Sequence, residues 1–476
     1  MIKTLTDYYR LPENALGSLS LSSQTVSGNP GYFQFGEGNI CYGRSRLGAS
    51  STRAQASHFE TLRHVRRQGV KLLLPFDFTE VIENLRLERY RQKGSGGFER
   101  FATSQPVRKS YYLLRKTLPF RIRRHLQKIY FRDWKDISFP AWPVDFTVDN
   151  LHRELLLLLL QETGEKRLPF IWFWPEGARS SLIVTHDVET AAGRDFTSQL
   201  IDLDDAYGIK ASYQVIPEKR YKISDEYVSE IRSRGCEFNI HDLNHDGNLY
   251  QERAEFERRA AGINSYARRY HAQGFRAGAM YRRQDWYDAF EFSYDMSVPN
   301  VAHLEPLRGG CCTVMPYFMG NVVELPLTTT QDYSLFHILN DYSTGLWQTE
   351  LALIRKNHGL MSLLTHPDYL VEARARKVYE SLLDELRRMI INEEVWCALP
   401  RDVDHWWRAR SKMKLVRHGD QWEIVGPEHE RARIAYATLE GSQLIYNFSG
   451  TTMGDPSLDE RHPTGGETTS RLSRIG

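Results

Sequence analysis

From about residue 170 to about residue 400, short apolar segments alternate with amphipathic helical patterns. This alternation constrains the fold most strongly, because strands that alternate with helices form parallel sheets. We predict an α/β fold, a distorted (β/α) barrel of about seven strands. The helical patterns are clearest at 252–271, 346–356 and 373–393. The predicted strands are 170–174, 181–185, 211–216, 237–241, 322–327, 360–365 and 396–399.

The chain of 476 residues is longer than one typical domain. We assign residues 1–150 to an N-terminal accessory region and residues 151–410 to the barrel. Residues 411–450 contain two segments in which apolar and polar side chains alternate, which predicts a small β-element. Gly, Ser, Thr and Pro are frequent in residues 451–476, so we predict a disordered tail there.

The composition is typical of a soluble protein in a reducing compartment. The formal net charge is only +2, too small for the whole surface to bind nucleic acid electrostatically. The five cysteines contain no Cys-x-x-Cys pair, which argues against a thiolate zinc site and favours reduced thiols. The first residues lack an apolar signal core, and the leucine run 155–160 is far shorter than the roughly 20 residues that span a bilayer. We therefore expect a cytoplasmic protein.

Residues 108–132 form the most polarised segment of the chain. They contain nine Lys or Arg residues and no acid, interleaved with aromatic and aliphatic residues. A basic amphipathic helix of this kind can lie on an anionic membrane surface, so peripheral contact with the inner face of the membrane is one interpretation. A second is a solvated helix face that also packs on the next domain. RNA binding is a third interpretation, which no other feature of the sequence supports.

Polar residues with metal-site chemistry follow four of the strand-like segments. Asp187 and Glu189 alternate on an extended segment and therefore point to the same side. His241 and His245 are four residues apart, so both rings can point the same way from one helical turn and bind one divalent ion. Simpler interpretations are a helix cap with a solvated acid for the first pair and two packing histidines for the second.

Two further residues complete the candidate site. Arg276 follows a short strand-like segment, and a guanidinium there would keep a neighbouring carboxylate ionised. His366 follows the almost wholly apolar segment 360–365, where a histidine is a plausible general acid. A surface ion pair and a buried structural histidine are the simpler interpretations. Because the carboxyl ends of barrel strands carry the chemistry, we expect these side chains to converge.

Taken together, the four motifs resemble the polysaccharide deacetylase family, carbohydrate esterase family 4, in a divergent branch. The resemblance covers about residues 170–405. It implies a divalent ion, most often Zn²⁺, and removal of an acetyl group from an N-acetylated sugar. The implied roles are base for Asp187, acid for His366, tether of Asp187 for Arg276, metal ligands for Glu189, His241 and His245, and lining of the acetyl pocket for Leu364.

The motifs depart from the family pattern at three places. Val188 separates two acids that are usually adjacent aspartates, so Asp187 would become the ligand, and not the base, if Glu189 did not reach the ion. Asp242 stands where Ser or Thr is usual, and residues 277–279 lack the usual prolines. Tyr281 and Tyr369 lie near the motifs and are candidate sugar-stacking residues, with core packing as the alternative.

The main hypothesis is a metal-dependent N-deacetylase in bacterial surface-polysaccharide metabolism. Its substrate would be an N-acetylated glycan or a lipid-linked sugar. A second hypothesis is a hydrolase of another non-peptide C–N bond in a small molecule. A third is a catalytically inactive barrel that binds glycans. No feature of the sequence predicts the oligomeric state.

Overall fold

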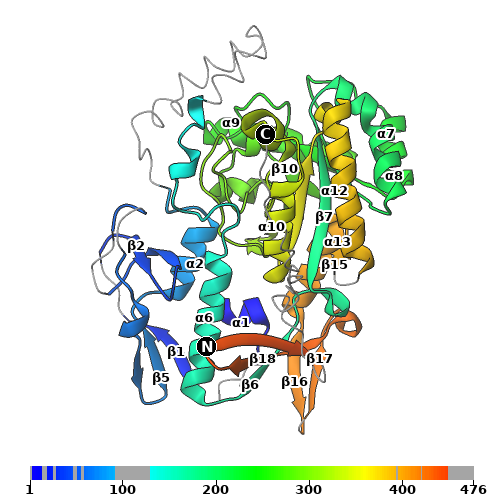
Figure 1. Ribbon diagram of the computed structural model, residues 1–476. Coiled ribbons are helices and arrows are strands. Elements are labelled where there is room, and N and C mark those ends of the chain that lie inside the picture. The colour runs from blue at the N-terminus through cyan, green and yellow to red at the C-terminus, as the bar shows by residue number, and fades with distance from the viewer. Residues whose placement is uncertain are drawn as a thin grey trace, which may run out of the picture.

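The computed structural model describes residues 3–12, 19–24, 28–46, 51–54, 58–91, 129–392, 395–419 and 421–448. Figure 1 shows a barrel-like sheet with its helices in the upper part of the molecule and smaller sheets from both ends of the chain below it. Most of the basic segment 108–132 and all of the predicted tail 451–476 lie outside the described residues.

A nine-stranded sheet curls around the barrel, in the order β12-β13-β11-β10-β9-β8-β7-β14, with β15 also paired to β7. Its pairs are parallel except for the antiparallel pair of β12 and β13. The predicted α/β barrel is thus confirmed. The strands are β7 (Ser180–Val188), β8 (Ser212–Val215), β9 (Glu237–His241), β10 (Gly274–Arg276), β11 (Tyr294–Asp295), β12 (Tyr317–Met319), β13 (Val322–Glu324), β14 (Leu360–Thr365) and β15 (Val395–Cys397).

Threonine side chains bring the two ends of the curled sheet together. After β13, the chain pairs with the segment that follows β11, where Leu327 N donates to Val298 O at 3.0 Å. The Thr328 hydroxyl then donates to Leu360 O of β14 at 2.7 Å and accepts from Ser362 N at 2.9 Å. These hydroxyl bonds satisfy backbone groups of β14 on the side away from β7.

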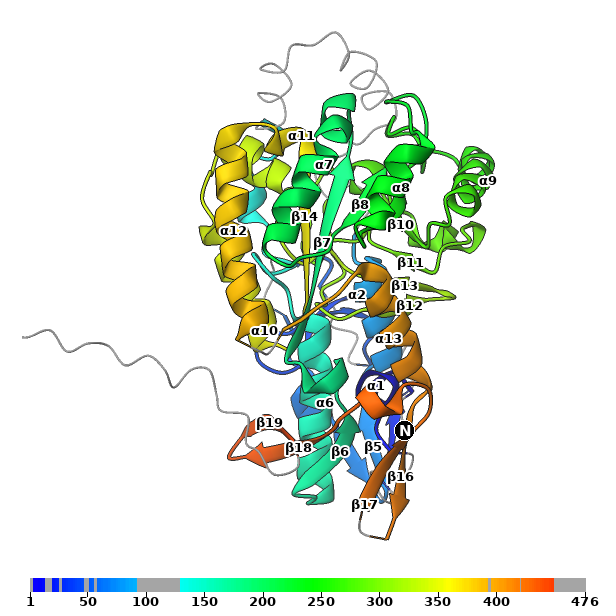
Figure 2. The ribbon, with the colours of Figure 1, turned by 90° about the vertical axis from the view of Figure 1, so that its right-hand side faces the viewer.

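Helices cover the outside of the sheet (Figure 2). They follow from apolar stripes at helical spacing and from polar caps. For example, the Thr190 hydroxyl caps α7 and the Ser224 hydroxyl caps α8. The helices are α7 (Ala191–Ala206), α8 (Asp225–Ser233), α9 (Arg253–Arg269), α10 (Gly345–Lys356), α11 (Pro367–Leu370), α12 (Ala373–Ile391) and α13 (Pro400–Lys412).

The described part of the N-terminal region forms small sheets and short helices. Strands β1 and β5 are parallel, β4 joins β5, and β2 and β3 form an antiparallel hairpin. This region packs on a long helix, α6, whose leucine run 155–160 is mostly buried. The elements are α1 (Lys3–Tyr9), β1 (Ser20–Ser23), β2 (Gly31–Gln34), β3 (Ile40–Gly43), β4 (Arg66–Gln68), β5 (Lys71–Leu74), α2 (Phe78–Arg86) and α6 (Thr147–Thr163).

The predicted strand 170–174 forms partly, as β6 (Arg167–Ile171), but it does not belong to the barrel. It pairs with β18 (Ile434–Glu440), which also pairs with β19 (Gln443–Phe448), and β16 (Lys414–His418) pairs with β17 (Gln421–Val425). The strands of the barrel sheet therefore begin at β7. An apolar pattern predicts a strand but does not identify the sheet that it joins.

The N-terminal and C-terminal elements share one hydrophobic core. The hydroxyls of Tyr9 and Tyr446 lie 2.6 Å apart, and both rings pack on Phe170 of β6. The guanidinium of Arg410, on α13, donates to Tyr8 O at 3.0 Å. The accessory region thus packs on elements that precede the barrel strands in the sequence and on elements that follow them. No helix of the described ranges has the length and apolar character that crossing a bilayer requires.

Candidate active site

The residues predicted for the site lie at one edge of the barrel sheet. Asp187 lies near the end of β7, His241 ends β9, Arg276 ends β10, and His366 follows β14 directly. Glu189 is the first residue beyond β7. Neighbouring strands are parallel, so their carboxyl ends meet at the same edge, as expected for a β/α barrel site.

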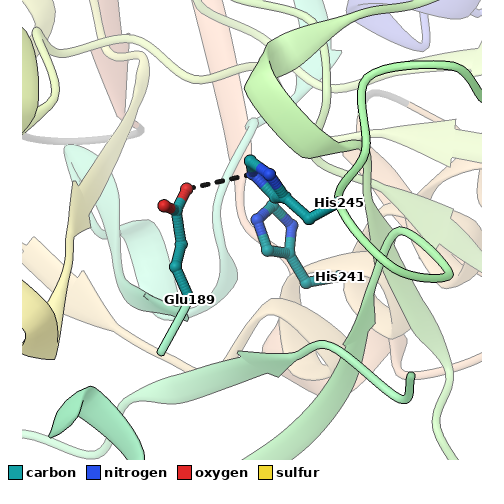
Figure 3. A group of neighbouring side chains, drawn as sticks. All are labelled: Glu189, His241 and His245. Carbon is teal, nitrogen blue, oxygen red and sulfur yellow. Dashed lines mark ion pairs between the residues drawn. The ribbon is translucent and has the colours of Figure 1, made fainter. Parts of the chain in front are cut away.

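Glu189, His241 and His245 form a compact cluster (Figure 3). Each offers one ligand atom, and these atoms all lie within 4.8 Å of one another. The Nε2 atom of His245 is 3.0 Å from Oε1 of Glu189. The Nε2 atom of His241 is buried and has no hydrogen-bond partner. Two imidazoles and a carboxylate are a donor set that suits Zn²⁺, and an ion would bind this nitrogen together with the Glu189–His245 pair. The residues therefore fit a divalent ion.

Protonation also favours ligation by His241. Its Nδ1 lies 3.1 Å from Arg276 O, and a carbonyl only accepts, so Nδ1 carries the proton and Nε2 is free to bind. Burial lowers the pKa of His241 to about 4, which keeps the ring neutral. For His245, burial is outweighed by the Glu189 carboxylate, which raises its pKa. A proton therefore competes with a metal ion at His245, and metal binding should weaken in acid.

The two histidines do not lie on a helical turn, contrary to the prediction. His241 ends β9, and the chain then forms a loop in which Asp242 and His245 both have left-handed backbones, with φ of 58° and 53°. The ring centroids of the two histidines are 4.9 Å apart. The loop is held by Arg220, which donates to His245 O at 2.6 Å, and by the Asp242 carboxylate, which accepts from Leu243 N at 2.6 Å. Two histidines four residues apart in the sequence can lie on a helix or, as here, on such a loop.

Gly278 allows the turn after Arg276 to pack against the histidine loop. A Cβ at this position would lie 2.7 Å from Oδ2 of Asp242 and 2.9 Å from Cδ2 of His245. We expect Gly278→Ala to cost about 1–3 kcal/mol of stability through overpacking. We also expect it to weaken zinc binding by about 10–100-fold, because the displaced groups orient a ligand. Thermal unfolding with and without zinc measures both effects.

Gly262→Ala, in α9, is the matched control. A Cβ there meets only Leu243 Cδ1 at 3.7 Å, an ordinary contact, and alanine favours the helix. This variant should bind zinc as the wild type does. Equal zinc affinity in the two alanine variants would contradict the role assigned to Gly278.

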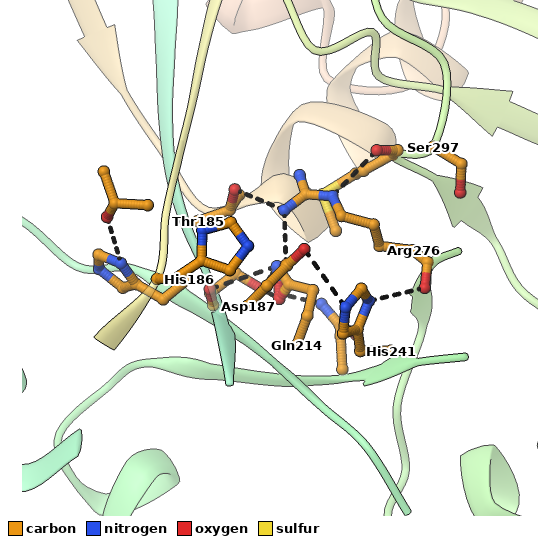
Figure 4. A network of polar contacts seen from close by, with 12 residues as sticks. Thr185, His186, Asp187, Gln214, His241, Arg276 and Ser297 are labelled. Carbon is orange, nitrogen blue, oxygen red and sulfur yellow. Dashed lines mark hydrogen bonds and ion pairs between the residues drawn. The ribbon is translucent and has the colours of Figure 1, made fainter. Parts of the chain in front are cut away.

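Asp187 lies between Arg276 and His241 (Figure 4). Arg276 NH1 donates to Oδ1 of Asp187 at 2.9 Å and to the Thr185 hydroxyl at 2.9 Å, while its Nε donates to Met296 O at 3.0 Å. Oδ2 of Asp187 is 3.6 Å from Nε2 of His241. Burial raises the pKa of Asp187, but Arg276 and the facing imidazoles outweigh it, so the pKa is lowered overall. Asp187 is therefore an ionised carboxylate beside the histidine cluster.

His366 is oriented by Asp332, a residue that the sequence motifs did not identify. The Oδ1 atom of Asp332 is 2.6 Å from Nδ1 of His366, and its Oδ2 accepts from His366 N at 2.7 Å. Nε2 of His366 then faces Glu189, 3.9 Å from Oε1. Burial opposes the charged ring, but Asp332 and the site carboxylates raise the pKa of His366 to about 10. Because Asp332 lies at the start of a helical segment and not at a strand end, no sequence pattern points to it.

Asp368 is a second residue whose role was not predicted. Its Oδ2 accepts from Glu189 N at 2.9 Å, and its Oδ1 contacts the Thr190 hydroxyl. A Cβ at Gly193, in the first turn of α7, would lie 2.4 Å from the same carboxylate. Asp368 thus ties the start of α11 to the turn that carries Glu189.

The residues predicted to contact substrate lie in different surroundings. Leu364 is buried in a small apolar cluster with Met280 and Leu327. The Tyr369 ring is half-buried, and its centroid is 5.0 Å from that of His366. Tyr281 is also half-buried, but it packs against the hydrophobic core between the sheet and its helices. Leu364 and Tyr369 therefore lie next to the site residues, and Tyr281 packs on the core.

Comparisons with known proteins gave structural matches only. No family model and no curated protein matches the chain. A Mycobacterium smegmatis protein described as a polysaccharide deacetylase is 17% identical, with a TM-score of 0.41, over 53% of this chain and 98% of its own. The allantoinase Puue is 10% identical, with a TM-score of 0.39, over 49% and 92%. A family 4 acetyl xylan esterase from Clostridium thermocellum, in complex with a cobalt ion, is 12% identical, with a TM-score of 0.32, over 48% and 91%.

These identities and TM-scores are low, so the chemistry of the site is inferred from its own side chains. Polysaccharide deacetylases, the family that the four motifs resemble, are among the solved structures to which this chain is similar.

Proposed function

We propose that this protein is a metal-dependent hydrolase that removes the acetyl group from an N-acetylated sugar. The observation that carries the proposal is the convergence of three metal-ligand side chains, Glu189, His241 and His245, between an ionised carboxylate and a histidine held by its own acid. Amide hydrolysis requires an activated water, a base and a proton for the leaving amine.

The side chains divide this work between two sides of the cluster. A divalent ion at Glu189, His241 and His245 would supply an activated water and polarise the acyl carbonyl. Asp187, kept ionised by Arg276, accepts the proton of the attacking water. His366 donates a proton to the leaving amine, and Asp332 orients the ring and stabilises its protonated form. The apolar cluster of Leu364, Met280 and Leu327 fits the acetyl methyl group.

We extend the proposal to a sugar of bacterial surface-polysaccharide metabolism, with a glycan or a lipid-linked sugar as substrate. The aromatic ring of Tyr369 beside His366 supports a sugar substrate, because aromatic faces stack on apolar faces of sugars. The cytoplasmic location and the membrane contact stay predictions from the sequence, since most of segment 108–132 lies outside the described residues.

Acetate release from a panel of N-acetylated sugars tests the proposal. The wild-type protein should release acetate and free amine in equal amounts, stop with a chelator, and recover with added zinc. Zinc-loaded protein that releases no acetate from monosaccharides, oligosaccharides or lipid-linked sugars would reject the deacetylase activity. Release of ammonia from a primary amide, or ring opening of a small cyclic amide to its amino acid, would instead favour another C–N hydrolase.

Replacement of Asp332 by asparagine isolates the role of His366. We expect Asp332→Asn to lower kcat by about 10²-fold or more, as expected for a misplaced general acid, with zinc content unchanged. A general acid must be protonated, so activity falls as pH rises through its pKa. Because Asp332 raises the pKa of His366, its loss should move the alkaline decline of kcat to lower pH. A pH profile of kcat checks this.

Glu350→Gln is the control for that change, because it alters a buried acid of α10 that binds Thr330, two residues before Asp332. Burial raises the pKa of Glu350 to about 8, so this side chain is largely protonated at neutral pH, and it accepts from Thr330 N at 2.9 Å. Glutamine is a neutral isostere, so the alkaline decline of kcat should stay at the wild-type pH. An alkaline decline at the wild-type pH in Asp332→Asn would contradict the assignment of His366 as the acid.

A further inference from the structure

Glu88, from the N-terminal region, is buried against loops of the barrel. It follows α2 with a left-handed backbone, φ 53°. Its carboxylate accepts from Arg282 Nε at 2.6 Å, from NH2 of the same guanidinium, and from Gly310 N at 2.7 Å. Gly309 leaves room for it, because a Cβ there would lie 2.5 Å from Oε1 of Glu88. In both ribbon views α2 lies next to the barrel (Figures 1 and 2). The accessory region therefore places a buried carboxylate against two loops of the barrel.

Arg282 connects this anion to the turn that follows Arg276. Its NH1 donates to Met280 O at 2.8 Å. Ala279 and Met280 are consecutive non-glycine residues with left-handed backbones, φ 54° and 51°. Such a backbone is strained and persists only where the surrounding structure holds it. The bond from Arg282 to the Met280 carbonyl is one such restraint.

Each part of this turn touches the candidate site. Arg276, at its start, binds Asp187. Gly278 packs on His245 of the metal cluster. Met280 forms the apolar wall with Leu364, two residues before His366. A shift of the turn would therefore move the base, a metal ligand and the acyl wall together.

Glu88 is also the carboxylate that balances the charge of Arg282. The side chains of both residues are almost fully buried, with exposed fractions of 3% and 1%. Burial opposes its ionisation, but Arg282 and Arg91 outweigh this and lower the pKa of Glu88. Two other buried acids, Glu305 and Glu324, interact electrostatically with Arg282, but burial raises the pKa of both, that of Glu305 to about 7. The Glu305 carboxyl also accepts a hydrogen bond from Gln331. Without Glu88, the buried guanidinium would lack a fully ionised partner.

We propose that Glu88 is a positioning residue of the active site, which holds the turn 277–281 through Arg282 and so fixes the width of the acyl pocket. The accessory region thereby contributes to the selectivity of the enzyme for small acyl groups. This inference rests on the proposed function, because acyl selectivity is meaningful only for a deacylase.

The test compares two acyl groups on the same amino sugar. We expect Glu88→Gln to lower the ratio of kcat/KM for N-acetyl over N-propionyl substrate by at least about five-fold, a part of what one methylene is worth in an apolar pocket. A ratio does not depend on the folded fraction, so a purely structural role would leave it unchanged. Arg282→Met should lower the acetyl-over-propionyl ratio as much as Glu88→Gln does. The double variant should lower this ratio no further than Arg282→Met alone, because both changes remove the same interaction.

Tyr90→Phe is the matched control at the same interface. It removes the hydrogen bonds of the Tyr90 hydroxyl with Gly310 O, at 2.7 Å, and with Cys312 Sγ, and it leaves the ion pair of Glu88 and Arg282 in place. This variant should keep the wild-type ratio. If Glu88→Gln does not fold, Glu88→Asp, which retains the charge on a shorter side chain, should show a smaller decrease of the same ratio.

Amide hydrogen exchange separates the inference from the proposed function. Exchange in a peptide covering residues 277–282 should rise in Glu88→Gln and not in Tyr90→Phe, whether or not the wild type is a deacetylase. An unchanged ratio with unchanged exchange, or equal effects in the two variants, would overturn the positioning role. Raised exchange in Glu88→Gln with no acyl release by the wild type would keep the positioning role and reject the proposed function.

Discussion

Replacement of Asp187 by asparagine should lower kcat by about 10³-fold while the protein still binds one equivalent of zinc. Asparagine keeps the shape of the side chain but does not accept a proton from water. The three ligand side chains, Glu189, His241 and His245, are unchanged, so zinc should stay. The variant also leaves Arg276 without its buried carboxylate, which should lower the stability by about 3–5 kcal/mol. Steady-state kinetics, zinc content and denaturant unfolding on one preparation measure all three effects.

Asp204→Asn separates the loss of stability from the loss of chemistry. Asp204 is a fully buried acid that accepts from the Tyr379 hydroxyl at 2.8 Å and lies 3.0 Å from Nε2 of His186. Its replacement should destabilise the fold and leave kcat of the folded protein near the wild-type value. If Asp187→Asn lost zinc, Asp187 would be a ligand and not the base. If it kept the wild-type kcat, another group would accept the proton.

Replacement of His241 by alanine should abolish zinc binding and activity together. Only Glu189 and His245 would then remain as ligands, fewer than catalytic zinc sites use. In the wild type, zinc at about 1,000 times its dissociation constant should add about 4 kcal/mol to the free energy of unfolding. In His241→Ala this increment should vanish. Unfolding curves with and without zinc give the difference directly.

The control for His241→Ala is another fully buried histidine far from the site. His152 lies in α6, and its Nδ1 is 2.7 Å from Val148 O. His152→Ala should lower the stability of the metal-free protein and retain the full zinc increment. A wild-type protein without any zinc increment would contradict the metal site. Equal increments in wild type and His241→Ala would contradict the role of His241.

The order of the barrel elements could be predicted because several strands and helices are long and regular. For β9 and β14, the predicted ranges 237–241 and 360–365 agree with the structure. Strands β10, β11 and β12 have only two or three residues, too few for a periodic pattern. Strand β6 was predicted as part of the barrel, but its apolar residues serve the core shared by both ends of the chain.

The candidate site could be predicted to the extent that its residues follow strands. Asp187, Glu189, His241, Arg276 and His366 lie within one residue of a strand end, where the parallel sheet brings them to one edge. Asp332 and Asp368 both lie at the start of helical segments and not at strand ends, and their partners are 34 and 179 residues away in the chain. Such contacts depend on tertiary packing, which a local sequence pattern does not predict.

The N-terminal region shows the same limit on a larger scale. Its sequence suggested an accessory region, because no motif lies within it. Glu88 nevertheless bonds to Arg282, 194 residues away, and is as buried as the residues of the site. A single acid at the end of an amphipathic helix is ordinary in sequence, and only the fold gives it a buried partner.

Anomalous diffraction from zinc-loaded crystals tests the central claim most directly. The account predicts one peak, about 2 Å from a carboxylate oxygen of Glu189 and from Nε2 of both His241 and His245. Zinc bound at any other place, or a fully occupied ion that one of these three side chains does not touch, would contradict it.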